Sequence, residues 1–234
     1  MTPPLRLLLQ SFSLFALVGP AFAEELPAAE QCDRSVIVSG GPCLEGSEHS
    51  LPGILEEKHR NVLGFILGKS DFPAARRIFG DAESWSSGDA AAAEEKLCYL
   101  AGDRESVVTV VVSTDKEMSS GSVDGLRIIR GRPSFENRCA RTSVDPAKIQ
   151  TRSGIHLGMS SDELKAILGP QTGFKAGLRL YNYCEESQLG PQDKLYNDCF
   201  VSGKSVASRC SGVIARFDEG GLKWFQIELG NPTC

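Results

Sequence analysis

Three histidines, His49, His59 and His156, are the potential general bases of this chain, and a hydrolase needs such a base beside its nucleophile. His156 lies in the stretch SGIHLG, at the place where a similar, earlier stretch has Ile66. The nucleophile elbow Gly-x-Ser-x-Gly does not occur in the sequence. We therefore expect His156 to be a surface or partly buried side chain, and we expect the chain not to be an enzyme.

The acidic residues do not form a convincing catalytic pair. Asp162 and Glu163 fall in the first turn of an expected helix, where the helix dipole favours negative charge. Asp218 and Glu219 fall at an expected hairpin tip. Each pair thus has a structural explanation.

The cysteines are even in number, which in an exported chain indicates four disulfides. No two of them are spaced Cys-x-x-Cys, and no histidine stands at ligand spacing from a cysteine. We therefore expect no metal and no cofactor. The eight residues are Cys32, Cys43, Cys98, Cys139, Cys184, Cys199, Cys210 and Cys234.

The first 23 residues have the order of a secretory signal peptide. One basic residue, an apolar run, a Gly-Pro break and the letters AFA follow one another, and the mature chain then begins at Glu24. The apolar run is shorter than the roughly 20 residues that cross a bilayer, and no second run follows. We expect an exported protein of the bacterial periplasm or the cell exterior, without a membrane span in the mature chain.

Charge argues against nucleic acid as a partner. The formal net charge is −5 at pH 7, with 25 basic and 30 acidic residues. The basic residues are scattered along the sequence and form no cluster that could follow a phosphate backbone. We expect another protein as the partner.

Two stretches resemble each other and indicate an internal repeat: LGFILGKSDFPAARRIFGD from Leu63 and SGIHLGMSSDELKAILGPQ from Ser153. In the second stretch, a capping box of Ser160 and Glu163 precedes apolar residues at helical spacing, and Gly169 ends the helix. The first stretch has the same features, with Ser70 as the expected cap and Gly80 as the stop. It is one residue longer between cap and stop.

Each expected helix is followed by a loop and three strand-like segments separated by turn residues. We therefore predict an α+β fold of two tandem units, each a short helical segment plus a three-stranded (or larger) antiparallel sheet. The predicted domains are a signal peptide (1–23), a disulfide-closed N-terminal extension (24–60), repeat unit 1 (61–140), a linker (141–152) and repeat unit 2 (153–234). The strand segments are KLCYL, SVVTVVVS and GLRIIR, then LYNYC, GVIARF and GLKWFQIEL.

The pattern I-x-LGMSSDEL-x-x-ILGPQ, with a sheet after it, resembles the β-lactamase inhibitory protein fold and the small lipoproteins that help assemble the bacterial outer membrane. The inhibitory proteins are themselves tandem duplications of such a unit. The resemblance implies a noncatalytic exported protein that binds another protein through the exposed face of its sheet. It would either assist envelope assembly or inhibit an enzyme. The alternative is an exported hydrolase with an unrecognised active site.

Aromatic residues in two strands are the predicted partner contacts. Alternation along GLKWFQIEL separates Trp224 and Gln226 from a more apolar face that includes Phe225. Tyr181 and Tyr183 likewise share one face of LYNYC. Trp is a frequent interface anchor, so these residues mark a possible binding face. The other possibility is that this face packs on the second repeat.

The duplication also yields a disulfide map, because equivalent places should bond equivalently. It predicts Cys98–Cys139 and Cys184–Cys234, each within one repeat. The other cysteines then pair locally, as Cys32–Cys43 and Cys199–Cys210. The chief rival is a sequential pattern in the second repeat, Cys184–Cys199 with Cys210–Cys234.

Cleavage is predicted after Ala23. N-terminal sequencing of the exported protein should return Glu24 as the first residue, because Ala21 and Ala23 fit the small-residue positions of the cleavage site. Recovery of Met1, or of a residue well inside the mature region, would contradict the prediction.

Overall fold

The computed structural model describes residues 50–87, 93–103, 106–115, 121–175, 177–191 and 206–230. The predicted signal peptide lies outside these residues, as do Cys32, Cys43, Cys199 and Cys234. Residues 50–60, which the sequence assigned to the N-terminal extension, are described and contribute to the folded body.

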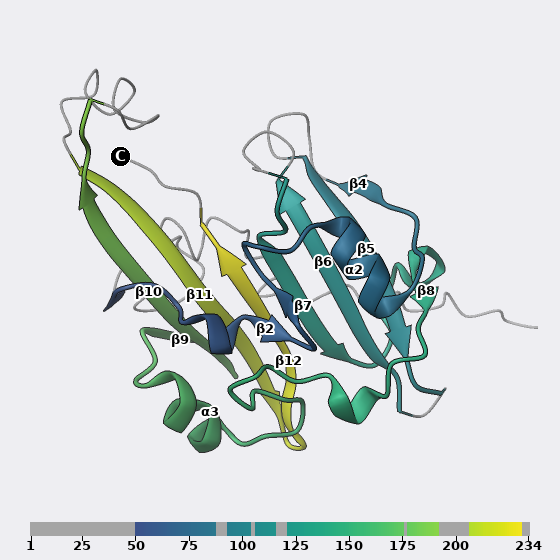
Figure 1. Cartoon of the computed structure of the whole chain (residues 1–234). Helices are drawn as coiled ribbons and strands as arrows, with labels where there is room; N and C mark the ends of the chain where they lie inside the picture. The colour runs from purple at the N-terminus through teal and green to yellow at the C-terminus, as the bar shows by residue number, and fades with distance from the viewer. Residues whose placement is uncertain are drawn as a thin grey trace, which may run out of the picture.

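A ten-stranded mixed sheet dominates the structure (Figure 1). Its main path runs β1-β10-β11-β12-β7-β6-β5-β4, with β8 beside β5 and β9 beside β10. The first half comprises β4 (Trp85–Ser87), β5 (Glu94–Ala101), β6 (Val108–Asp115), β7 (Gly125–Arg130) and β8 (Ala140–Arg141). The second half comprises β1 (Leu51–Pro52), β9 (Gly173–Lys175), β10 (Leu178–Gln188), β11 (Val206–Asp218) and β12 (Gly221–Leu229).

The predicted fold class is wrong, because the protein is mostly β and its two halves share one sheet. β7 and β12, the last long strands of the halves, pair antiparallel with each other, as Leu126 opposite Ile227 and Ile128 opposite Phe225. Two parallel pairings, β1 with β10 and β5 with β8, make the sheet mixed. The described residues therefore form one large mixed sheet with two short α-helices, instead of two tandem units with separate antiparallel sheets.

The helices α2 (Phe72–Phe79) and α3 (Ser161–Leu168) are each eight residues long and end at a glycine. The capping box of Ser160 and Glu163 at α3 is present as predicted. At α2 the cap is Asp71, whose side chain accepts a hydrogen bond from the Ala74 N–H, whereas Ser70 accepts one from the N–H of Ile66. This shift by one residue removes the length difference between the two sequence stretches.

The helices cover one side of the sheet, here called the front face, which faces the viewer in Figure 1. Their buried residues, Ala75 and Phe79 from α2 and Leu164 and Leu168 from α3, belong to one core cluster with alternate residues of the strands. The small hairpin of β2 (Asn61–Val62) and β3 (Phe65–Ile66) joins the same cluster through Val62 and Phe65. The strand residues of this cluster include Leu97, Tyr99, Val110, Val112, Leu126, Ile128, Val213, Ala215, Phe225 and Ile227.

The glycines that precede the two helices dock each half onto the start of a central strand. Gly68 donates its N–H to the carbonyl of Val123 at 2.8 Å, just before β7. Gly158 donates to the carbonyl of Leu222 at 2.9 Å, at the start of β12. The repeated Leu-Gly of the sequence thus makes the same kind of backbone contact twice.

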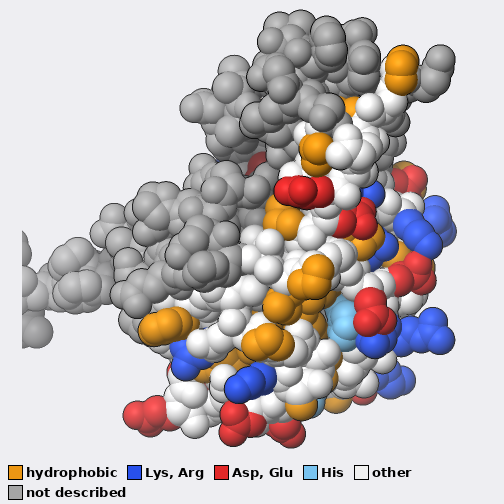
Figure 2. Space-filling model, turned by 90° about the vertical axis from the view of Figure 1, so that its left-hand side faces the viewer, with side chains coloured by type: hydrophobic (Ala, Val, Ile, Leu, Met, Phe, Trp, Pro, Cys, Tyr) orange, Lys and Arg blue, Asp and Glu red, His pale blue; other side chains and the backbone are white. Residues whose placement is uncertain are grey.

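The outer edge of the second half is formed by short strands beside β10. β1 has two residues and β9 three, and Glu185 and Glu186 of β10 are exposed beyond them. Figure 2 shows this side of the molecule, with hydrophobic side chains set among acidic and basic ones. Short edge strands and charged residues are typical devices against pairing with a second sheet.

Two disulfides are described, one in each half. Cys98 bonds to Cys139, as predicted, with Cα atoms 4.4 Å apart, because the parallel pairing of β5 with β8 brings them together. Cys184 bonds to Cys210 at 4.2 Å, so the predicted pairs Cys184–Cys234 and Cys199–Cys210 are wrong, and so is the rival pattern. The physical reason is the register of β10 and β11, which places Cys184 directly opposite Cys210.

Replacing Gly221 by alanine should strongly destabilise the fold. Gly221 has φ +91°, and an added Cβ would lie 2.8 Å from the carbonyl carbon of Gly158 and 2.9 Å from the carbonyl oxygen of Met159. A positive φ costs a residue with a Cβ about 1–2 kcal/mol, and overpacking against backbone adds about 1–3 kcal/mol. Chemical denaturation measures the free energy of unfolding.

Gly131→Ala is the matched control for this substitution. Gly131 also has a positive φ, +103°, but an added Cβ there would meet no atom within 4 Å. Gly131→Ala should therefore lower the free energy of unfolding only by the cost of the positive φ, about 1–2 kcal/mol. Equal losses in the two variants would contradict the close docking of Gly158 on β12.

Candidate protein-binding face

The side of the sheet away from the helices, here called the back face, carries the alternate residues of the same strands. Neither of the two described α-helices packs on it. One row across six strands illustrates its mixed character: it combines a disulfide cysteine, apolar residues, an arginine and a glutamine. The cysteine and the apolar residues of this row are buried, at most 7% exposed, whereas the arginine and the glutamine are half-buried. The row consists of Cys98, Val111, Arg127, Gln226, Ile214 and Leu180.

Both tryptophans of the chain lie on the back face. Trp85 of β4 pairs with Lys96, which shares its face with Cys98. Trp224 of β12 pairs with Ile129, in the strand beside Arg127. The register therefore places the two rings on the same side, four strands apart.

An arginine lies over each tryptophan ring. The Cζ atom of Arg127 is 5.1 Å from the ring centroid of Trp224, and that of Arg138 is 5.9 Å from the ring centroid of Trp85. Phe135 adds an aromatic contact to Trp85, with ring centroids 5.7 Å apart. Cations within about 6 Å of an aromatic face are attracted by the ring quadrupole. Both groups therefore combine apolar area, positive charge and fixed geometry.

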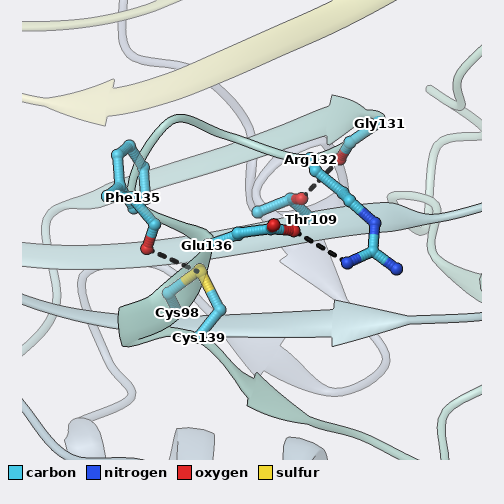
Figure 3. Close-up of a disulfide and its surroundings, with 7 residues drawn as sticks. All are labelled: Cys98, Thr109, Gly131, Arg132, Phe135, Glu136 and Cys139. Atoms are coloured by element: carbon cyan, nitrogen blue, oxygen red, sulfur yellow. Dashed lines mark hydrogen bonds and ion pairs between the residues drawn. A yellow bond between two sulfur atoms is a disulfide. The ribbon is translucent and has the colours of Figure 1, made fainter. Parts of the chain in front are cut away.

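The segment that carries Phe135 and Arg138 is held to the sheet at both ends (Figure 3). At one end the Thr109 hydroxyl donates to the carbonyl of Gly131 at 2.6 Å. At the other end Cys139 is bonded to Cys98 of β5. The disulfide thus fixes the position of the aromatic and cationic side chains near Trp85.

A polar chain crosses the centre of the back face, where the two halves meet. Arg127 Nε donates to Gln226 Oε1 at 2.5 Å, and Gln226 Nε2 donates to Glu228 Oε1. Glu228 is buried, whereas Arg127 and Gln226 are half-buried. The chain fixes the Arg127 side chain in place, so its exposed part needs little ordering on contact with a partner.

Trp224 and Gln226 lie on the same face, as the alternation predicted, but Trp224 is only 6% exposed. Arg127, which lies over the Trp224 ring, contributes to that burial. Contact by a partner would therefore begin with Arg127 and Gln226 and reach Trp224 only through them. The role of Trp224 in binding stays a prediction.

Tyr181 and Tyr183 lie on the front face, opposite Trp224 and Gln226. Tyr181 pairs with Val213 and is fully buried in the core, so it is not a surface contact. Tyr183 is half-buried, and its hydroxyl donates to the carbonyl of Leu168 at the end of α3. The structure therefore does not bring the four predicted contact residues together.

Trp85 is a candidate contact that the sequence analysis did not identify. It stands in the short segment SWSS between α2 and β5, outside the longer strand patterns. Its face becomes visible only from the pairing of Trp85 with Lys96. An isolated aromatic residue before a strand was the only local signal.

Two tyrosines and one histidine that are largely removed from water have shifted pKa values. Burial raises the pKa of Tyr99 and of Tyr183 to about 12 and lowers the pKa of His59. The Tyr99 hydroxyl has no hydrogen-bond partner within the described part of the protein. His156, as expected, is a surface residue; its Nδ1 lies 2.8 Å from the carbonyl oxygen of Gly154.

Two features are absent from the described ranges. No group of three or more His, Cys, Asp or Glu residues is arranged to hold a metal ion there. In the same ranges, no helix has the length and apolar character to cross a membrane.

Comparisons with protein-family models, with curated proteins and with solved structures found no match for this chain. The resemblance to the β-lactamase inhibitory protein fold and to the outer-membrane assembly lipoproteins therefore stays a prediction.

Stability should fall between about pH 10 and pH 12. The pKa of tyrosine in an unfolded chain is about 10, whereas burial raises that of Tyr99 to about 12 in the folded state. Below pH 10 both states are protonated and the contribution is complete. Above it the unfolded state loses its proton first, so unfolding becomes more favourable. Urea unfolding across this range measures the loss.

Tyr99→Phe isolates the contribution of one hydroxyl. This variant should be at least as stable as the wild type near pH 7, because it removes a buried donor without a described partner. Its stability should fall less steeply above pH 10. A pH profile identical to that of the wild type would show that Tyr99 is accessible to water in the folded protein.

Proposed function

We propose that this chain is a noncatalytic, exported binding protein of the bacterial envelope, whose back face docks on another protein. The proposal is supported by the two tryptophans on that face, each beneath an arginine. Trp and Arg are enriched among the residues that dominate protein–protein binding.

The dimensions and rigidity of the back face suit such a contact. Four strand spacings separate the tryptophan-bearing strands, which corresponds to about 19 Å. Cys98 and Val111, which lie between the two groups, are at most 7% exposed, so the contact is made by the tryptophan–arginine groups and by the half-buried Gln226. The disulfide near Trp85 and the polar chain beside Trp224 hold both groups in place, which lowers the entropic cost of binding.

The hydrolase alternative has less support. His156, the base it would use, is exposed, and its Nδ1 is near a backbone carbonyl. By contrast, the back face carries two tryptophan–arginine groups, and both residue types are common in protein–protein interfaces.

The partner is either part of the machinery that assembles the envelope or an enzyme that the protein inhibits. The predicted signal peptide and the two described disulfides favour an oxidising compartment outside the cytoplasm. The same face serves both roles, so the identity of the partner separates them.

Arg127→Ala combined with Arg138→Ala should weaken binding at least tenfold. The two substitutions remove the cations that lie over the two tryptophan rings and leave the backbone hydrogen bonds of the sheet in place. Affinity capture from an envelope extract, with the mature wild-type chain as bait, supplies the partner. Calorimetric titration of the purified partner then measures the affinity of each variant.

Arg77→Ala is the matched control, because Arg77 is an exposed residue of α2 on the opposite side of the sheet. It should bind like the wild type. If the double variant binds with unchanged affinity while it remains folded, the back face is not the binding surface.

A further inference from the structure

The turn between β2 and β3 holds a leucine in a backbone conformation that leucine rarely adopts. Leu63 has φ +55° and the next residue, Gly64, has φ +86°. Positive φ at both central residues defines a type I′ hairpin turn, whose first position usually carries Asn, Asp or Gly. Among the described non-glycine residues, only Leu63 has a positive φ.

The conformation has a cost that the Leu63 side chain does not offset by full burial. A left-handed conformation costs a residue with a Cβ about 1–2 kcal/mol. The Leu63 side chain is 37% exposed, so it is one of the few large hydrophobic residues that the described part of the protein leaves in water. Observed strain of this kind is a reason to look for a function.

The surrounding structure holds the turn rigidly. Val62 and Phe65, on either side of the turn, are completely buried in the core. The carbonyl of Asn61 accepts the N–H of Arg152 at 2.7 Å, and its side chain accepts the N–H of Gly64 at 3.0 Å. The leucine is therefore displayed at a fixed position, and little conformational entropy remains to be lost when it is bound.

The charges near the turn indicate what kind of surface would receive it. The segments that carry and brace the hairpin, residues 56–69 and 151–153, contain four basic and two acidic residues, in a chain whose net charge is −5. Glu56 and Glu57 are paired with Lys58 and Lys69, at 2.9 and 2.5 Å. Arg60 and Arg152 account for the local excess of positive charge, but Arg60 is half-buried and donates to the carbonyl of Leu67, so the exposed Arg152 is the cation that a partner would meet.

From these observations we propose that the β2–β3 hairpin is a second docking element, whose Leu63 inserts into an apolar pocket with an acidic rim on another protein. Its position on the front face separates it from the back-face site. A lipid surface fits less well, because one leucine provides only about 1.5–3 kcal/mol of burial and two of the nearby lysines are already ion-paired.

Site-specific crosslinking tests the proposal in cells that export the protein. Leu63 is replaced by the photo-crosslinking residue p-benzoylphenylalanine, and Ile54, which is also 37% exposed, is replaced in a parallel control. The proposal requires one protein that crosslinks from position 63 and not from position 54. Crosslinks from both positions alike, to lipid, to a second copy of this chain, or to nothing would overturn it.

Variants of Leu63 then separate binding from folding, with the crosslinked protein purified as the probe. Leu63→Asn should raise the melting temperature by about 2–4 °C, since Asn tolerates this backbone conformation, and should weaken binding at least tenfold. Leu63→Met keeps the apolar side chain and should bind within threefold of the wild type. Arg152→Glu should also weaken binding, and the loss of affinity should be larger at low salt than at high salt, because salt screens the interaction between charges.

If Leu63→Asn stabilises the protein and binds as tightly as the wild type, the leucine has no docking role. The Arg127→Ala and Arg138→Ala double variant is tested in parallel for crosslinking from position 63. Its crosslinking from position 63 is expected to be unchanged. A failure of the back-face proposal would show as unchanged affinity of the double variant, whereas a failure of the hairpin proposal would show as unchanged affinity of Leu63→Asn.

Discussion

The antiparallel pairing of β7 with β12 is the contact on which the rest of the structure depends. It aligns the two halves so that a row of buried apolar residues continues across the join without interruption. Each of these side chains is at most 1% exposed, and burial of each contributes about 2 kcal/mol. The row consists of Leu97, Val112, Leu126, Ile227, Val213 and Tyr181.

The same pairing determines what the back face presents. Because side chains alternate along a strand, the register that aligns Leu126 with Ile227 also aligns Arg127 with Gln226. The polar chain from Arg127 through Gln226 is therefore built from both halves, and neither half contains it alone. A shift of one residue in this register would bury the arginine and expose the core.

Local patterns predicted local structure well in this chain. The capping box at Ser160 and the segments GLRIIR and GLKWFQIEL have the boundaries that α3, β7 and β12 adopt, because caps, stops and alternation act over a few residues. The joining of the halves was not predictable in the same way, since it depends on which strand edges remain open after each half has formed. The two-residue strands β1 and β8 carry no periodic signal at all.

The cysteines also show that sequence patterns do not determine which distant segments become neighbours. Analogy between the repeats gave Cys98–Cys139 correctly, but it failed for Cys184 because that residue has a cysteine directly opposite it in β11. Cys184 and Cys210 meet because they lie opposite each other in the adjacent strands β10 and β11. Cys139, in contrast, reaches Cys98 only because the chain returns after β7 and places β8 alongside β5. Sequence spacing alone cannot distinguish these two arrangements.

The two described disulfides also differ from the central join in how they stabilise the protein. They close loops of 41 and 26 residues within the separate halves, and each is worth about 3–4 kcal/mol in the chain-entropy model. Neither bond links one half to the other, so cohesion across the centre depends on the pairing of β7 with β12 and on the core beneath it. Arg127 and Gln226 lie opposite each other in this pairing, so their relative position is kept as long as β7 and β12 stay paired. The positions of Phe135 and Arg138 beside Trp85 depend instead on the Cys98–Cys139 bond.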